Sequence, residues 1–138
     1  MDKNNIFNVP DTYARNADLI VDMVEWLDKN GFTGNSDMAI YGNGYAVATW
    51  DTWGNVEGEE LSDLARGWYF YEDKYAGDYF EYANERTVSM SFEGTFNHVM
   101  NGYVDGWIEL YEQFMEIPRK YGLFFEMGYS WTLSAHKI

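Results

Sequence analysis

The chain has 138 residues, of which 46% are hydrophobic and 20% aromatic, and its formal net charge is −14 at pH 7. This length suits one domain that buries roughly two thirds of its unfolded surface, and the aromatic content excludes a disordered acidic tail. The absence of cysteine excludes disulfides, cysteine metal sites and thiol nucleophiles.

From its sequence we expect neither a signal for export nor a membrane-spanning segment. Residues 1–5 lack the basic and apolar regions of a secretory signal. No apolar stretch approaches the roughly 20 residues that span a bilayer. We therefore expect one acidic domain over residues 1–138 that works in the cytoplasm, or in the host cytoplasm if a phage encodes it.

The N-terminal part predicts a helix followed by a β-hairpin. Within about residues 11–30, apolar residues recur at steps of three and four, as on the buried side of a helix: Ala17, Ile20, Val21, Val24 and Leu27. Asp11 suits the N-cap of this helix, and Asn30 with Gly31 suits its end. Residues 38–41 and 45–50 flank a Gly-Asn-Gly sequence that permits a tight turn, which predicts two paired strands.

Residues 51–85 concentrate acidic and aromatic side chains. Ten acidic residues face two basic ones here, so this quarter of the chain has a net charge of −8. Several aromatic residues here follow a helical spacing, which predicts a helix. Glycines in the same stretch weaken a helix, and the high density of aromatic residues favours strands. We expect a helix at about residues 60–66 and strands near 68–73 and 78–83.

Alternating and helical patterns follow each other in the C-terminal part. Residues 86–93 alternate apolar and polar side chains, which predicts a half-buried strand before a short helix that ends at Asn101 and Gly102. Residues 104–117 show the clearest helical pattern, and Pro118 ends it. Its apolar stripe consists of Val104, Trp107, Ile108, Tyr111, Phe114 and Met115, opposite Glu109, Glu112, Gln113 and Glu116. Two strands, at 123–127 and 129–135, complete the chain.

These elements predict an α+β fold. We expect an antiparallel sheet of about five to six of these strands, packed with two main helices at about 11–30 and 104–117 and with one or two short helices.

No residue pattern predicts catalysis or a metal site. His98 and His136 lack a second His or Cys at ligand spacing. We expect no enzymatic activity, and hence no catalytic residue, metal or cofactor. Paired carboxylates beside aromatic rings also serve glycoside hydrolases, but 23 acidic residues yield many such pairs by chance.

The acidic surplus predicts the class of partner. A net charge of −14 exceeds the magnitude of about 2–8 that suits a small soluble domain, and it repels nucleic acid and anionic membranes. A basic protein surface is the complementary target. Carboxylates on a folded scaffold stand about 5–7 Å apart, and DNA phosphates recur every ~3.4 Å of axis on each strand, so the two spacings are of the same order.

From this similarity we expect an acidic inhibitor that mimics nucleic acid. It would bind the basic surface of a bacterial nuclease or a ribonucleoprotein defence complex, as antirestriction and anti-CRISPR proteins do. An immunity protein that neutralises a basic toxin is the first alternative, because it uses the same physics. A glycan-binding module or a small glycoside hydrolase is the second.

The candidate partner-binding residues come from the acidic segment at 51–85. Carboxylates steer the encounter, and exposed aromatic residues supply anchors of large contact area. The candidates are Glu57, Glu59, Glu60, Asp63, Glu72, Asp73, Asp78 and Glu81, with Trp53, Tyr71 and Tyr79 as anchors. The aromatic excess also allows a homodimer.

Overall fold

The computed structural model describes the backbone of residues 3–5, 11–34, 36–42, 45–50, 56–58, 69–75, 83–84 and 86–138, and the side chains of 16, 18–33, 36–42, 83–84 and 86–138. The α-helices are α1 (Asp11–Lys29), α3 (Thr95–Met100) and α4 (Trp107–Glu116), and the 3₁₀ helices are η2 (Phe32–Gly34) and η4 (Ile117–Tyr121). The strands are β1 (Lys3–Asn5), β2 (Met38–Gly42), β3 (Tyr45–Trp50), β4 (Val56–Gly58), β5 (Tyr69–Tyr75), β6 (Val88–Phe92), β7 (Leu123–Met127) and β8 (Thr132–Lys137).

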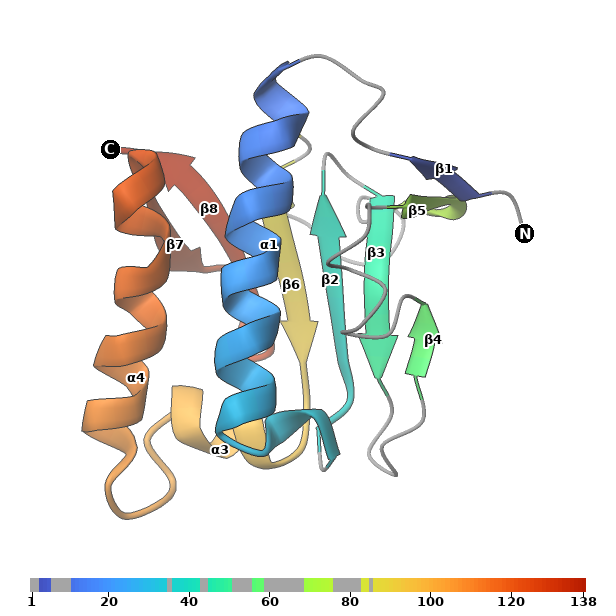
Figure 1. Cartoon of the computed structure of the whole chain (residues 1–138). Coiled ribbons are helices and arrows are strands. Elements are labelled where there is room, and N and C mark those ends of the chain that lie inside the picture. Colours follow the sequence, from blue (N-terminus) through green and yellow to red (C-terminus); the bar gives the residue numbers. More distant parts are fainter. Residues whose placement is uncertain are drawn as a thin grey trace.

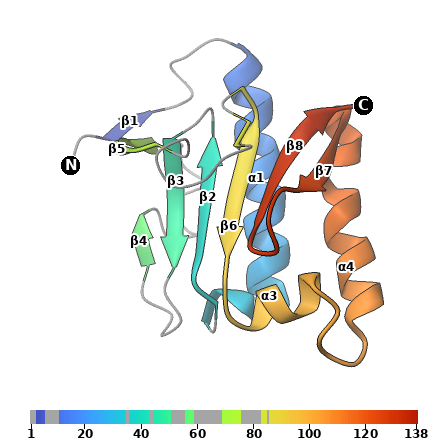
Figure 2. The ribbon, with the colours of Figure 1, turned by 180° about the vertical axis from the view of Figure 1, so that it is seen from behind.

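The strands form one sheet, and α1 and α4 cover one of its faces (Figure 1). The strand order is β1-β5-β3-β2-β6-β8-β7, with β4 also bonded to β3, and each described pairing is antiparallel. Seen from behind, the strands lie in front of both helices (Figure 2). The chain is therefore an α+β protein with helices packed on an antiparallel sheet, as its sequence predicts.

The expected number of five to six strands is not confirmed. The described sheet has eight strands, and those with described side chains are the adjacent β2, β6, β8 and β7. β1 and β4 have three residues each and are held in the sheet by hydrogen bonds to a neighbouring strand. Three residues are too few to show an alternating apolar pattern, so the sequence does not predict these strands. β5 matches the strand expected near 68–73. The helix expected at 60–66 and most of the strand expected at 78–83 lie outside the described residues.

α1 packs its apolar side on the sheet. The fully buried residues recur at steps of three and four, which gives one buried stripe: Leu19, Ile20, Met23, Val24 and Leu27. Val21, which the sequence places in this stripe, lies at its margin and is partly exposed. Opposite the stripe, the sheet contributes Met38, Ile40, Val88, Met90 and Leu133 to the same core.

An aromatic cluster joins the helices to the sheet. The ring of Phe96 in α3 lies 5.0 Å from that of Phe114 in α4 and 5.3 Å from that of Phe92 in β6. Trp26 of α1 lies 5.2 Å from Phe114 and stacks on Phe32 at 5.7 Å. Offset and edge-on aromatic contacts of this kind stabilise a core beyond the area they bury. The cluster therefore holds α1 beside α4.

α4 begins later than the sequence predicts. Gly106 adopts a left-handed conformation (φ 78°) that a right-handed helix excludes, so the helix starts at Trp107 and leaves Val104 in the preceding loop. Phe114 is the fully buried residue of this helix. Ile108 lies six residues before it, about a third of a turn away around the helix, and its side chain is 55% exposed. The prediction that Ile108 belongs to the buried stripe is wrong.

Strand β6 is buried on both faces, whereas its alternation predicts one solvated face. Ser89 points away from the helices and is only 1% exposed. Its Oγ lies 2.9 Å from Ser134 Oγ and accepts a hydrogen bond from the backbone N–H of Asn84 at 2.8 Å. Small hydroxyl side chains are compatible with burial here because their polar atoms are satisfied by neighbours.

Replacing Phe96 by alanine tests the aromatic cluster. Removing its fully buried ring leaves a cavity among Phe92, Phe32 and Phe114, so we expect Phe96→Ala to lower the free energy of unfolding by about 3–5 kcal/mol. The matched variant Ile108→Ala removes an exposed side chain and should change it by no more than about 0.5 kcal/mol. Urea denaturation followed by tryptophan fluorescence measures both values. Similar losses in the two variants would contradict the assignment of Ile108 to the surface.

Candidate functional site

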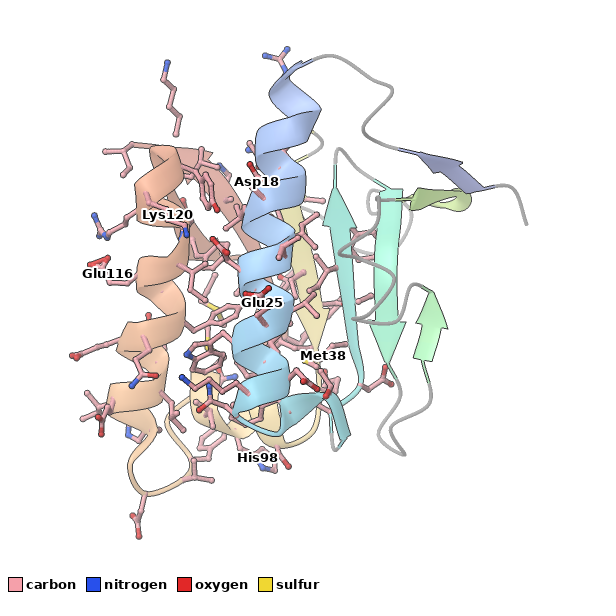
Figure 3. The ribbon with its side chains drawn as sticks, viewed as in Figure 1. Asp18, Glu25, Met38, His98, Glu116 and Lys120 are labelled. Atoms are coloured by element: carbon pink, nitrogen blue, oxygen red, sulfur yellow. The ribbon has the colours of Figure 1, made fainter. Side chains whose placement is uncertain are left out.

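Acidic side chains gather on the outer side of the two long helices. We call this set the helical acidic surface; it consists of Asp18, Asp22, Glu25 and Asp28 on α1 and Glu109, Glu112 and Glu116 on α4. All are exposed except Asp22, which is partly buried. Figure 3 shows Asp18 and Glu25 on the side of α1 that faces away from the sheet.

The local sequence explains why these carboxylates line up. Asp18, Asp22 and Glu25 follow each other at steps of four and three, and Glu109, Glu112 and Glu116 at steps of three and four. Such neighbours lie on one side of a helix, about 5–6 Å apart. Since the opposite sides of both helices are apolar and pack on the sheet, the carboxylates must face the solvent.

Packing between the helices joins the two rows into one surface. The Trp26 indole N–H in α1 donates a hydrogen bond to Gln113 Oε1 in α4 at 3.2 Å. A shallow hollow of about 250 Å³ is lined by α1, α4 and η4 together, through Asp22, Gln113, Glu116, Ile117 and Lys120. The acidic residues of α1 and α4 are therefore neighbours in space although about 90 residues separate them in the chain.

A tether at Asp22 fixes η4 against α1. The Tyr121 hydroxyl donates a hydrogen bond to Asp22 Oδ2 at 2.5 Å, and Lys120 Nζ lies 2.7 Å from the same oxygen. Partial burial, followed by the hydrogen bond to Asp22, raises the pKa of Tyr121 to about 12. The hydrogen bond from Lys120 to Asp22 raises the pKa of that ammonium group. The cation and the phenol together hold the carboxylate in one position.

Most of the helical acidic surface is not neutralised by the described basic residues. The ion pairs within the part of the chain with described side chains join Lys120 to Asp22 and Arg119 to Glu116, at 2.9 Å for the latter. Both pairs lie toward the C-terminal end of α4. Glu25, Glu109 and Glu112 have no ion pair among these residues, although the exposed Lys29 follows Glu25 by four residues on the same side of α1.

The structure describes only some of the residues that the sequence predicts for partner binding. Glu57 lies in β4 opposite Thr49, while Tyr71, Glu72 and Asp73 lie in β5. β5 pairs with the first residues of β3 and β4 with its last ones, so these positions lie along the same side of the sheet, remote from β7, but at different ends of β3 (Figure 1). The remaining predicted residues lie outside the described residues: Trp53, Glu59, Glu60, Asp63, Asp78, Tyr79 and Glu81.

A cavity of about 520 Å³ opens on the face of the sheet opposite the helices. It is lined by Ala83, Asn84, Glu126, Met127, Gly128 and His136. The β7–β8 register pairs Glu126 with Ser134 and Phe124 with His136, so Glu126 and His136 are diagonal neighbours on one face. The Asn84 side chain makes two hydrogen bonds: its Nδ2 donates to Ala135 O, and its Oδ1 accepts from the backbone N–H of Arg86. The described lining residues thus include one carboxylate, Glu126, and one imidazole, His136, whereas a glycosidase uses a pair of carboxylates.

Comparison with known proteins assigns no family to this chain. No protein-family model, curated protein or solved structure matches this chain. Among the described residues, no cluster of three or more His, Cys, Asp or Glu side chains could hold a metal ion. None of the helices in the described part combines the length and the apolar character needed to cross a membrane.

The sequence places Glu109, Glu112 and Glu116 opposite the apolar stripe of α4, but neither they nor the acidic residues of α1 were predicted to belong to the candidate site. The signal was present, because their spacing marks a solvent-facing side on each helix. The sequence does not show that α1 and α4 are adjacent. It therefore could not predict that the acidic residues of the two helices form one surface. His136 and Glu126 were missed for the same reason, since only the β7–β8 pairing places them together.

The tether at Asp22 predicts a loss of stability at high pH. A phenol whose pKa is raised to about 12 in the folded state, against about 10 when unfolded, stabilises the fold fully below about pH 10. This contribution is lost as the pH rises toward 12. We expect the free energy of unfolding of the wild type to fall more steeply over this window than that of Tyr121→Phe, measured by urea denaturation at each pH. Parallel curves for the two proteins would contradict the tether.

Proposed function

We propose that this protein binds a basic protein surface through the helical acidic surface and acts as an inhibitor of a bacterial nuclease or defence complex. Its carboxylates would take the place of nucleic-acid phosphates in a groove lined by Lys and Arg. Association in this way is a binding function, and it requires no catalytic group, metal or cofactor from this chain.

One observation carries the proposal. Two antiparallel helices present seven carboxylates on one side of the molecule, and Glu25, Glu109 and Glu112 have no ion pair among the described residues. Holding like charges together lowers stability through repulsion, so an arrangement of this kind favours a role in which an opposite charge approaches. The tether at Asp22 and the Trp26–Gln113 hydrogen bond keep the rows in register, which reduces the entropy lost on binding.

The same electrostatics also fit an immunity protein that neutralises a basic toxin. Affinity capture from a bacterial lysate distinguishes the two, because a defence inhibitor retains a large nuclease or ribonucleoprotein and an immunity protein retains one small toxin. The cavity at Glu126 and His136 is the observation in favour of the glycan-binding alternative. An oligosaccharide that bound there would lose affinity in His136→Ala but not in variants of the helical acidic surface.

Neutralising three carboxylates at a time tests which acidic surface binds. We expect Glu25→Gln, Glu109→Gln and Glu112→Gln together to weaken binding of the captured partner roughly tenfold, since each exposed ion pair contributes about 0.2–1 kcal/mol. The free energy of unfolding should change by less than about 1 kcal/mol, because these groups are exposed and have no ion pair among the described residues. Isothermal calorimetry at several salt concentrations measures affinity, and the salt dependence should become shallower as charges are removed.

Two matched triple variants complete this experiment. The first triple variant removes the same charge from exposed positions off the helical acidic surface: Asp37→Asn, Glu93→Gln and Glu126→Gln. Its affinity should stay within about threefold of wild type. The second triple variant tests the acidic segment at 51–85: Glu59→Gln, Glu60→Gln and Asp63→Asn. If this segment contributes to binding, we expect this variant to bind more weakly and to remain folded. Binding that is insensitive to salt in the wild type would overturn the proposed function.

A further inference from the structure

The corner between α3 and α4 exposes two large apolar side chains to solvent. Tyr103 is 75% exposed in the loop, and Ile108 is 55% exposed in the first turn of α4. Ile108, Glu112 and Glu116 follow one another at steps of four, so the isoleucine continues one row of the helical acidic surface. Apolar side chains in such a position contribute nothing to the core and remain available for a contact with another molecule.

The loop that carries Tyr103 is held in one conformation. The N–H of Tyr103 donates to His98 O at 2.8 Å, and Asn101 Nδ2 donates to Ser130 O at 2.7 Å. Gly102 has a positive φ of 76° and lies against the Trp107 ring, where an added Cβ would approach to 3.2 Å. A partner therefore meets a preformed corner and does not have to order the loop on binding.

A hollow of about 280 Å³ lies between the two apolar residues. It is lined by the continuous segment 102–108, which includes Tyr103, Asp105 and Ile108. This volume falls just below the roughly 300–1,000 Å³ typical of small-molecule pockets, so it suits the side chain of a protein partner.

Charge around the corner is uniformly acidic along the chain. No Lys or Arg occurs in residues 87–118, which contain Asp105, Glu109 and Glu112. Arg119, Lys120 and Lys137 follow later in the chain, toward the C-terminus. Both views place the α3–α4 loop at the end of the molecule remote from the C-terminus (Figures 1 and 2), and Figure 3 shows His98 near that end and Lys120 further toward the other. Asp105, Glu109 and Glu112 thus have no Lys or Arg beside them in this segment of the chain, and their charges attract a basic partner during encounter.

We propose that this corner, formed by Tyr103, Asp105 and Ile108, is the anchor of the partner-binding surface and receives an apolar side chain flanked by Arg or Lys from a basic protein. This inference rests on the proposed function and names where the partner makes its desolvated contact. Exposed carboxylates alone steer an encounter, whereas buried apolar and aromatic contacts carry most binding energy.

Other occupants fit the corner less well. A second copy of this chain, docked symmetrically, would bring Asp105, Glu109 and Glu112 against their own counterparts. Nucleic acid and anionic lipid carry the same sign of charge as these residues. The N-terminal end of α4 contributes a positive partial charge of about half a unit, which the full negative charges of Asp105 and Glu109 exceed.

Two peptides of equal charge test the anchor. In the first, arginines alternate with leucine and tryptophan; in the second, glycine replaces the leucine and tryptophan. We expect the wild-type protein to bind the first about tenfold more tightly, as one apolar hot spot suggests. The double variant Tyr103→Ser, Ile108→Gln should bind the glycine peptide as wild type does and lose the preference for the first peptide. Fluorescence anisotropy of labelled peptides measures both affinities.

The control is Ile138→Gln, which removes an exposed apolar side chain (67% exposed) outside the corner and should keep the preference. The double variant should unfold at the wild-type denaturant midpoint, since both side chains are exposed. A preference that survives in the double variant, or that is missing in a wild-type protein that binds the glycine peptide, overturns the anchor. If the wild type binds neither peptide at low salt, or binds them without salt dependence, the proposed function itself fails.

Discussion

Burial of the apolar sides of α1 and α4 against one sheet is the constraint on which the rest of this structure depends. The aromatic rings of Trp26, Phe96 and Phe114 lie within 5.0–6.3 Å of one another and join α1, α3 and α4 in one core. Because each helix has a polar side opposite its apolar one, packing both on the same face of the sheet turns both polar sides outward together. The helical acidic surface is therefore a direct consequence of the core.

This arrangement holds like charges together at a cost in stability. Within the part of the chain with described side chains, the basic residues that neutralise the surface act at its edge, where Lys120 pairs with Asp22 and Arg119 with Glu116. The repulsion among the remaining carboxylates is offset by a core in which many large side chains are fully buried. A basic partner would remove the repulsion on binding, and the exposed Tyr103 and Ile108 would add apolar contact to an encounter guided by charge.

Patterns within single elements predicted much of the fold. The helix at α1, the hairpin of β2 and β3, strand β6, helix α3 and strand β7 occur where their periodicity and turn residues indicate, whereas β8 begins at Thr132 and not at the expected residue 129. The start of α4 was missed, because the left-handed conformation of Gly106 overrides an apolar pattern that extends to Val104. The short strands β1 and β4 were missed, because a three-residue strand at a sheet edge needs a neighbour's hydrogen bonds and no pattern of its own.

The amino-acid sequence by itself determined the α+β class, the acidic character and the polar sides of the helices, because these follow from composition and from spacing within one element. The tertiary structure alone decided that the acidic rows of α1 and α4 adjoin, that Glu126 and His136 line one cavity, and that Ile108 faces solvent beside Tyr103. The physical reason is that a periodic pattern specifies which side of an element is apolar, whereas its neighbours are chosen by the packing of the whole core.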